Sequence, residues 1–420
     1  MNVKERVLIA VVIFDERSVW TPQDTAVEME ELVKTCGAQV VEKVLCRAIP
    51  PTAATLIGSG KVKEIAEVCA FQKIDTVIVS FDLKGSQQRN LEDAFKVKTI
   101  DRTQLILDIF ARNARTPEAK MQVELAQLEY LLPRLTGKGV EMSRLGGGIG
   151  TMGPGETKLE VDRRRISDRV SKLKKDLKLV TLDRQLKRKK RKDNAVPAIS
   201  IVGYTNAGKS TLLSALTNAG QKTHDGLFTT LDSLSRQFFL PNHQKAIASD
   251  TIGFMHALPH HLIESFKTTL EEVSQADLLL HVLDISHPNA LNFYQSVNEV
   301  LSEIDVAGKP VIVVLNKIDK ITEPGLLDQL KKHFDNPVCI SGLLGQNLNE
   351  LLGRIEEVFS EDFVEIDVRL PLNRMDLVNL AHKEGKVKEV KYLPDAIFLS
   401  AVLPAKISYG FSAAALPAPP

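Results

Sequence analysis

The chain has 420 residues and a net charge of only +1, and 44% of its residues are hydrophobic. This length is too great for one typical core, so we expect two to four domains in a soluble globular protein. The four cysteines are widely scattered and form no C-x-x-C pair, which argues against a zinc site or a disulfide framework. A reducing cytoplasm is the expected location, with a peripheral association with membranes left open.

The first 115 residues alternate apolar runs with helical patterns. Residues 7–14 are apolar, but charged residues end this run well short of a membrane span or a signal sequence. Further strand-like runs cover 40–45 and 76–80. The alternation predicts a small parallel α/β domain over residues 1–115.

The sequence Gly58-Ser59-Gly60-Lys61-Val62 in this domain looks like a phosphate-binding loop. The standard loop needs an earlier glycine and a hydroxyl residue after the lysine, and here Thr55 and Val62 stand at those positions. Because Val62 cannot ligate Mg²⁺, we interpret the segment as the start of a helix.

Two long helical patterns follow and predict a helical hairpin over residues 116–194. Their apolar residues keep spacings of four and three. These are Met121, Leu125, Leu128, Leu132 and Leu135 in the first pattern, and Leu159, Ile166, Val170, Leu173, Leu177 and Val180 in the second. Pro133 is expected to bend or end the first helix.

A glycine-rich loop at 145–157 separates the two patterns. Gly148, Gly150 and Gly153 formally satisfy the G-x-G-x-x-G dinucleotide fingerprint. No strand precedes the loop and no βαβ unit surrounds it, so we reject that interpretation. Such a loop can instead bring its backbone close to RNA or to the nucleotide domain, unless it is merely flexible.

The second helical pattern is strongly basic. Residues 158–192 contain sixteen Lys and Arg against five Asp and Glu, a local net charge of +11, and end in six consecutive cations at 187–192. Such a run is a candidate for binding a nucleic-acid backbone. A solvated linker or an outer helix face would have the same composition.

Residues 195–360 contain an ordered set of motifs for a guanine nucleotide. The first, G-x-x-x-x-G-K-S at 203–210, follows the strand-like run 198–202 and precedes a helical pattern. The backbone N–H groups of such a loop surround a phosphate. Lys209 would reach the β- and γ-phosphates, and Ser210 would ligate Mg²⁺.

The second motif, Asp250-Thr251-Ile252-Gly253, also follows a strand-like run. Asp250 would enter the Mg²⁺ shell, and the Gly253 N–H would meet the γ-phosphate, so that the next loop senses this group. Between the two motifs, Thr230 is expected to offer a hydroxyl to Mg²⁺, although a turn-forming threonine pair is the open alternative.

The third motif, Asn316-Lys317-Ile318-Asp319, ends the strand-like run 311–315 and selects the base. Asp319 can accept two hydrogen bonds from guanine, and adenine lacks that pair of donors. Lys317 can lie on the purine face, and Asn316 can tie this loop to the phosphate loop. The backbone of 341–343 could support the base.

The expected catalytic residues are Lys209, Thr230 and Gly253, and the expected metal ligands are Ser210, Thr230 and Asp250. The expected nucleotide contacts are Gly203, Tyr204, Thr205, Asn206, Ala207, Gly208, Lys209, Ser210, Thr211, Phe228, Thr229, Thr230, Asp250, Thr251, Ile252, Gly253, Asn316, Lys317, Asp319, Ser341, Gly342 and Leu343.

Phe254 stands where many related sites have a glutamine that orients the attacking water. An apolar ring cannot polarise water, so we expect slow intrinsic hydrolysis, with the water positioned by a partner or by another loop. Asn206 resembles the asparagine of potassium-activated GTPases, which makes K⁺ a candidate second cation.

The patterns after residue 361 fit a small α+β domain over 361–410, and residues 411–420 are expected to be disordered. The expected fold class is therefore multidomain α/β. A P-loop GTPase domain with a parallel sheet is preceded by a small α/β domain and a helical hairpin, and is followed by the small α+β domain.

This combination resembles the HflX family of translational GTPases. The stretches that carry the resemblance are Gly58-Ser59-Gly60-Lys61, 146–160 with Asp162-Arg163-Arg164-Arg165, 203–210, and Asp250-Thr251-Ile252-Gly253-Phe254. The glycine-rich loop before the basic helix is the most specific of them. Met152 departs from the pattern, because members often carry a basic residue there.

The resemblance implies GTP hydrolysis stimulated by the large ribosomal subunit, binding to that subunit and its RNA, and a role in splitting or rescuing stalled or idle ribosomes. We expect a monomer that binds GTP and GDP and does not insert into membranes. Two alternatives stay open, an RNA-remodelling NTPase whose nucleotide site is mainly structural and a signalling GTPase with a protein effector.

Overall fold

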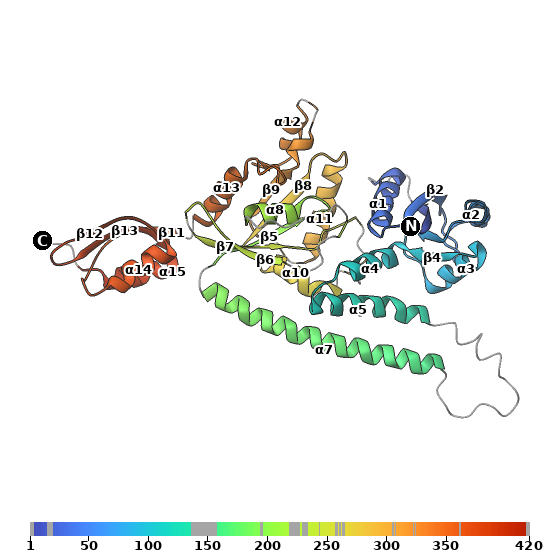
Figure 1. Cartoon of the computed structure of the whole chain (residues 1–420), viewed down its shortest axis with the longest axis horizontal. Helices are drawn as coiled ribbons and strands as arrows, with labels where there is room; N and C mark the ends of the chain where they lie inside the picture. Colours follow the sequence, from blue (N-terminus) through green and yellow to red (C-terminus); the bar gives the residue numbers. More distant parts are fainter. Residues whose placement is uncertain are drawn as a thin grey trace. The chain divides into compact units, whose positions relative to one another are not determined.

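The chain forms two compact units in the computed structural model, whose helices and strands are drawn in Figure 1. The first consists of Met1–Leu182, His224–Asp232 and Met255–Thr268, and the second of Asp183–Thr223, Ser233–Phe254 and Thr269–Pro420. The structure describes residues 4–14, 20–135, 158–193, 196–217, 227–228, 234–242, 244–256, 259, 262, 265–304, 306, 308–321, 323, 325–360 and 363–416.

The first unit begins with a parallel four-stranded sheet in the order β2-β1-β3-β4. Residues Leu8 to Val11 of β1 are fully buried, as expected for a parallel strand that is covered on both faces. Helix α2 starts directly after Gly58, as the sequence predicts. The elements are β1 (Arg6–Ile13), α1 (Pro22–Thr35), β2 (Gln39–Arg47), α2 (Ser59–Gln72), β3 (Thr76–Val79), α3 (Gly85–Phe95), β4 (Lys98–Asp101) and α4 (Arg102–Asn113).

A helical hairpin follows the sheet. Helix α5 (Pro117–Leu131) ends in the short η1 (Leu132–Leu135), which contains Pro133 as predicted, and α7 (Lys158–Asp193) runs back along it (Figure 1). The predicted stripes meet, because Leu125 packs against Leu173 and Leu177. The glycine-rich loop lies outside the described residues.

The second unit contains a six-stranded sheet in the order β10-β9-β8-β5-β7-β6. All neighbours are parallel except the edge strand β6, which is antiparallel to β7. The carboxyl ends of the parallel strands therefore share one edge, where open α/β sheets bind ligands. The elements are β5 (Ala198–Gly203), α8 (Lys209–Leu216), β6 (Leu234–Phe239), β7 (Lys245–Asp250), α10 (Lys267–Ser274), β8 (Leu278–Asp284), α11 (Ala290–Glu303), β9 (Val311–Asn316), η2 (Ile318–Lys320), α12 (Leu326–Lys331), β10 (Val338–Cys339) and α13 (Leu348–Ser360).

The C-terminal part forms an antiparallel sheet in the order β11-β13-β12. Its elements are β11 (Phe363–Leu370), α14 (Met375–Glu384), β12 (Lys386–Tyr392), β13 (Ile397–Pro404) and α15 (Ala405–Ala414). The expectation of a disordered tail from residue 411 is wrong as far as Ala414, because α15 continues to that residue and the Phe411 ring is fully buried in this core. Among the described residues, no helix is long and apolar enough to span a membrane.

Candidate nucleotide-binding site

The predicted phosphate loop connects β5 to α8, and glycine is required at both of its ends. Gly203 has φ +153°, and a Cβ there would lie 2.3 Å from the Val282 carbonyl oxygen. Gly208 has φ +94°, and a Cβ there would lie 2.3 Å from Nδ2 of Asn316. Only a residue without a side chain fits this backbone in the left-handed region.

Lys209 begins α8 and is buried inside the loop. Its Nζ donates to the carbonyl oxygens of Gly203 at 3.1 Å and Tyr204 at 2.8 Å. Burial lowers the pKa of this ammonium to about 8, and the nearby Asp250 carboxylate partly opposes that shift. The loop thus holds a cation whose charge is costly until an anion approaches it.

The two described residues predicted to bind Mg²⁺ are in contact. The Ser210 hydroxyl donates to Oδ2 of Asp250 at 2.5 Å, and Asp250 is only 1% exposed. The adjacent Thr251 hydroxyl donates to the Ile201 carbonyl oxygen at 2.8 Å. The side chain of Thr251 therefore ties the motif to β5.

The segment after Asp250 lies over the phosphate loop. A Cβ on Gly253 would lie 2.7 Å from Cγ2 of Thr205 and 3.1 Å from Nζ of Lys209. The next residue, Phe254, donates its N–H to the Gly203 carbonyl oxygen at 3.1 Å and accepts from the Thr205 N–H at 2.8 Å. Its ring is 1% exposed, so the side chain at the glutamine position belongs to the core.

Asn316 joins the loop after β9 to two other loops. Its Nδ2 donates to the Ala207 carbonyl oxygen at 2.8 Å, and its Oδ1 accepts from the Gly342 N–H at 2.9 Å. Lys317 donates to the Asn206 carbonyl oxygen at 2.8 Å and pairs with Asp284 at 2.6 Å. The phosphate loop and the predicted base-binding loops thus form one hydrogen-bonded structure.

Asp319 and Ser341 form the predicted base-binding end of the site. The Ser341 hydroxyl donates to Oδ1 of Asp319 at 2.5 Å and accepts from the Leu344 N–H at 3.1 Å. Asp319 is exposed while Ser341 is fully buried. The serine can therefore hold one carboxylate oxygen while the other stays available to a ligand.

Three of the predicted nucleotide contacts are not among the residues that these interactions connect. Thr229 and Thr230 lie outside the described residues. Phe228 belongs to the first compact unit, where it is 2% exposed and its carbonyl oxygen accepts from Asn113. Asp284, which pairs with Lys317, was not predicted, although its place at the carboxyl end of β8 is a usable signal.

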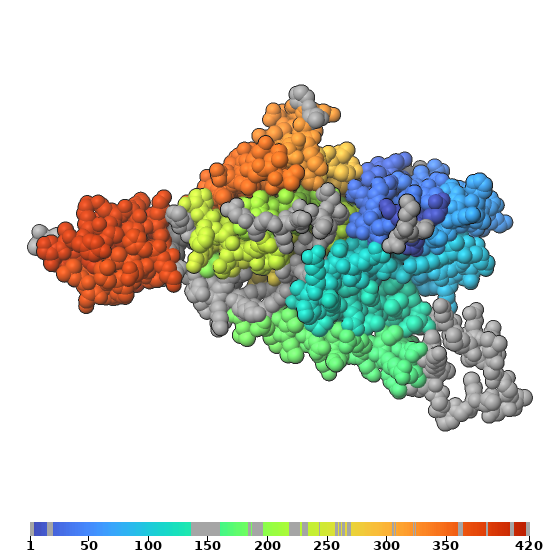
Figure 2. All heavy atoms as spheres, viewed as in Figure 1, coloured from blue at the N-terminus to red at the C-terminus, as the bar shows by residue number. Residues whose placement is uncertain are grey.

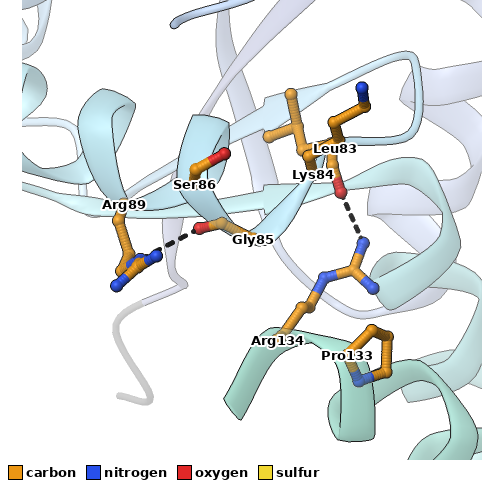
Figure 3. Close-up of a pocket in the computed structure, with 7 residues that line it drawn as sticks. All are labelled: Leu83, Lys84, Gly85, Ser86, Arg89, Pro133 and Arg134. Atoms are coloured by element: carbon orange, nitrogen blue, oxygen red, sulfur yellow. Dashed lines mark hydrogen bonds between the residues drawn. The ribbon is translucent and has the colours of Figure 1, made fainter. Parts of the chain in front are cut away.

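A separate pocket of about 430 Å³ lies in the first unit between the start of α3 and η1 (Figure 3). No predicted nucleotide contact lines it. The Arg134 guanidinium donates to the Leu83 carbonyl oxygen at 2.6 Å and pairs with Asp101 at 3.0 Å. Arg89 donates to the Gly85 carbonyl oxygen at 3.2 Å. Arg134 thus joins η1 to Leu83 before α3 and to β4, whereas Arg89 is engaged within α3.

Three protein-family descriptions match consecutive parts of the chain. These are "GTP-binding GTPase N-terminal" at 23–111, "GTP-binding GTPase Middle Region" at 113–191 and "50S ribosome-binding GTPase" at 198–317. A GTPase HflX from Caldanaerobacter subterraneus subsp. tengcongensis is 44% identical over 405 residues, which cover 96% of this chain and 92% of the relative. The chain belongs to the HflX family.

Two other HflX proteins have similar sequence identity to this chain. That of Lacrimispora saccharolytica is 43% identical over 407 residues, covering 97% of this chain and 95% of the relative, and that of Escherichia coli K12 is 40% identical over 346 residues, covering 82% and 81%. A crystal structure of a GTP-binding protein from Sulfolobus solfataricus with GDP is 26% identical, covers 85% of this chain and 99% of that one, and has a TM-score of 0.43. As an HflX protein, the chain binds guanine nucleotides and hydrolyses GTP.

Proposed function

We propose that this HflX protein hydrolyses GTP in response to the large ribosomal subunit and thereby splits or rescues stalled or idle ribosomes. The observation that carries the proposal is the burial of Phe254. Two backbone hydrogen bonds hold this residue against the phosphate loop, and its ring is in the core. The position that often supplies a water-orienting glutamine thus offers no polar group, so a partner or another loop would have to provide one, and we propose that the ribosome does.

Mg²⁺ is the proposed metal, and the two described ligands fit it. Ser210 in the first turn of α8 and Asp250 at the end of β7 present a hydroxyl and a carboxylate oxygen 2.5 Å apart, and oxygen donors suit this hard cation. The metal would neutralise charge on the β- and γ-phosphates. Thr230 is proposed as a third ligand. K⁺ near Asn206 is a further proposal, which equal hydrolysis rates in sodium and potassium buffers would contradict.

The remaining roles follow from the same geometry. Lys209 would exchange its two loop carbonyls for phosphate oxygens, since its buried charge favours an anionic partner. Gly253 would donate its N–H to the γ-phosphate. Asp319, held by Ser341, would accept from guanine, while Lys317 would lie along the ring.

The outer face of α7 supports an RNA partner. Arg163, Lys172, Lys175 and Lys178 are exposed, and the described part of the helix surface is open in Figure 2. Such a row of cations neutralises backbone phosphates whatever the base sequence of the RNA. We propose that the segments 1–115 and 116–194 contact ribosomal RNA and that the protein acts as a monomer.

The test is GTP turnover with and without purified large subunits, at two salt concentrations. Stimulation by the subunits that Lys209→Ala abolishes supports the proposal. Unchanged turnover would contradict it. Intact RNA remodelling by Lys209→Ala would favour a mainly structural nucleotide site, and unaltered function after deletion of 187–192 would favour a protein effector.

A further inference from the structure

The chain between β8 and α11 touches two parts of the candidate nucleotide site. It belongs to the same compact unit as the phosphate loop and the loop after β9. Asp284 ends β8 and lies in register with Asn316 at the end of β9. The next residue, Ile285, donates its N–H to the Asn316 carbonyl oxygen at 3.2 Å. Asp284 is thus fixed beside the residue that precedes Lys317.

The carboxylate of Asp284 holds the side chain of Lys317. Its Oδ2 lies 2.6 Å from the Lys317 Nζ, and the same ammonium donates to the Asn206 carbonyl oxygen at 2.8 Å. The side chain of Asp284 is 16% exposed and that of Lys317 is 18% exposed. Solvent ions therefore screen this pair less than an ion pair on the open surface, and the ammonium has two fixed acceptors.

Asp284 is itself oriented by the residues that follow it. Its Oδ1 accepts from the Ser286 N–H at 3.0 Å and from the Ser286 hydroxyl at 2.6 Å. One carboxylate oxygen thus faces Ser286 while the other faces Lys317. Rotating the carboxylate away from this plane would weaken the bonds at both oxygens, so the group has a defined direction.

An aromatic stack braces this part of the chain against the phosphate loop. The Tyr204 ring stacks on Phe293 of α11, with centroids 4.0 Å apart and an interplanar angle of 10°. The His287 ring also packs against Phe293, at 4.6 Å between centroids. Because His287 directly follows Ser286, moving the residue that orients Asp284 would disturb this stack.

The two anchors of the Lys317 ammonium matter because lysine is among the side chains that lose the most rotamer freedom when they are ordered. Asp284 and Asn206 are groups of the protein itself, so this loss is incurred on folding and not on binding. A purine ring that packs on the anchored stem has no lysine left to order. Preorganisation of this kind raises affinity without adding a contact to the ligand.

We propose that Asp284 is a positioning residue for the guanine base, because it fixes the Lys317 ammonium so that the lysine stem presents a preformed apolar surface to the purine face. The inference rests on the proposed contact of Lys317 with the ring. GTP and GDP have the same base, so Asp284 contributes equally to the binding of both. It contributes nothing to the chemical step, because uniform binding does not stabilise the transition state selectively.

The test compares Asp284→Asn with the matched control Asp328→Asn, which removes one carboxylate from the exposed surface of α12 in the same unit. Asparagine keeps an acceptor for Ser286 and loses the ion pair with Lys317. Affinities for GTP and for GDP, measured by calorimetric titration, should both fall about fivefold. KM for GTP should rise by a similar factor, while kcat stays within about twofold. The control should bind both nucleotides as the wild type does.

A double-mutant cycle with Lys317→Ala distinguishes positioning from a general effect on the fold. If Asp284 acts through the lysine, Asp284→Asn should cause no further loss of affinity in the Lys317→Ala background. An equal loss in both backgrounds would overturn the inference, and so would an Asp284→Asn protein that binds as tightly as Asp328→Asn. The cycle is informative even if Asp284→Asn is less stable, because a damaged fold would lose affinity in both backgrounds.

Lys317→Ala alone separates this inference from the proposed role of the lysine. If Lys317→Ala binds both nucleotides more weakly and Asp284→Asn does not, the lysine contacts the base but Asp284 does not position it. If Lys317→Ala binds both nucleotides as tightly as the wild type, the proposed contact between lysine and base is itself wrong, and the inference falls with it.

Discussion

The hydroxyl of Ser341 donates to the Asp319 carboxylate at 2.5 Å, and it is the buried serine that orients the exposed acid. Changing Asp319→Asn should lower affinity for GTP about 10²-fold and shift preference toward xanthosine triphosphate, which presents a carbonyl in place of the exocyclic amine. Competition binding with both nucleotides measures this. Ser341→Ala is the control, because it should weaken binding without changing base preference.

Nucleotide binding should take up a proton in mildly alkaline solution. The pKa of Lys209 is lowered to about 8 by burial, so above that pH the free protein has partly lost this proton. Phosphate favours the charged form and raises the pKa. Affinity should therefore fall as pH rises above about 8. Calorimetry at pH 8.5 in two buffers of different ionisation enthalpy should give different heats; equal heats would disprove the uptake.

The lowered pKa of Lys209 also affects the stability of the protein in the absence of nucleotide. Because the unfolded lysine binds its proton up to a higher pH than the folded one, the free energy of unfolding should rise with pH between about 8 and 10. Lys209→Arg, which keeps its proton throughout, should lack this contribution. Urea unfolding at several pH values compares the two proteins.

Gly253 should tolerate no side chain. An added methyl would lie 2.7 Å from Cγ2 of Thr205 and 2.9 Å from Cα of the same residue, so we expect the segment 250–253 to shift away from the phosphate loop. Gly253→Ala should reduce GTP turnover by roughly tenfold or more while leaving GDP affinity nearly unchanged. At Gly342 the corresponding nearest atom is 3.4 Å away, so Gly342→Ala serves as a milder control.

The cations of α7 should determine the salt dependence of RNA binding. Replacing Lys172, Lys175 and Lys178 with alanine should weaken binding to large subunits and flatten the plot of log affinity against log salt by roughly 0.7 to 0.9 per lost phosphate contact. Lys331→Ala in α12 is the control for losing a positive charge elsewhere on the protein surface. An unchanged slope would remove α7 from the RNA contact.

The arrangement of the candidate nucleotide site was predictable because its motifs follow strands, and the sheet brings strand ends to one edge. Asn316, Lys209 and Asp250 are therefore placed by local sequence and topology together. The edge strand β6 was not predicted, since its half-exposed residues give no continuous apolar run. The C-terminal helix α15 was missed because its large apolar core residues, Ile407 and Phe411, mark only one helical turn.

Contacts between the N-terminal sheet domain and the residues just after Phe254 could not be predicted at all. Arg102 and His256 are separated by 154 positions, and neither periodicity nor spacing relates them. The sequence did show that Phe254 replaces a polar residue, but not that its ring turns into the core. That direction depends on the two hydrogen bonds that its backbone makes with residues on either side of Tyr204.

The orientation of Phe254 also limits how this enzyme could evolve. A glutamine at this position would inherit a backbone bonded to Gly203 and Thr205 and a side-chain position that is only 1% exposed, where an amide is costly unless it finds buried partners. One substitution would therefore destabilise the domain without creating a water-orienting group. A polar group at this position would require the chain after Gly253 to be rerouted, so the need for a group from a partner or from another loop would outlast any single substitution.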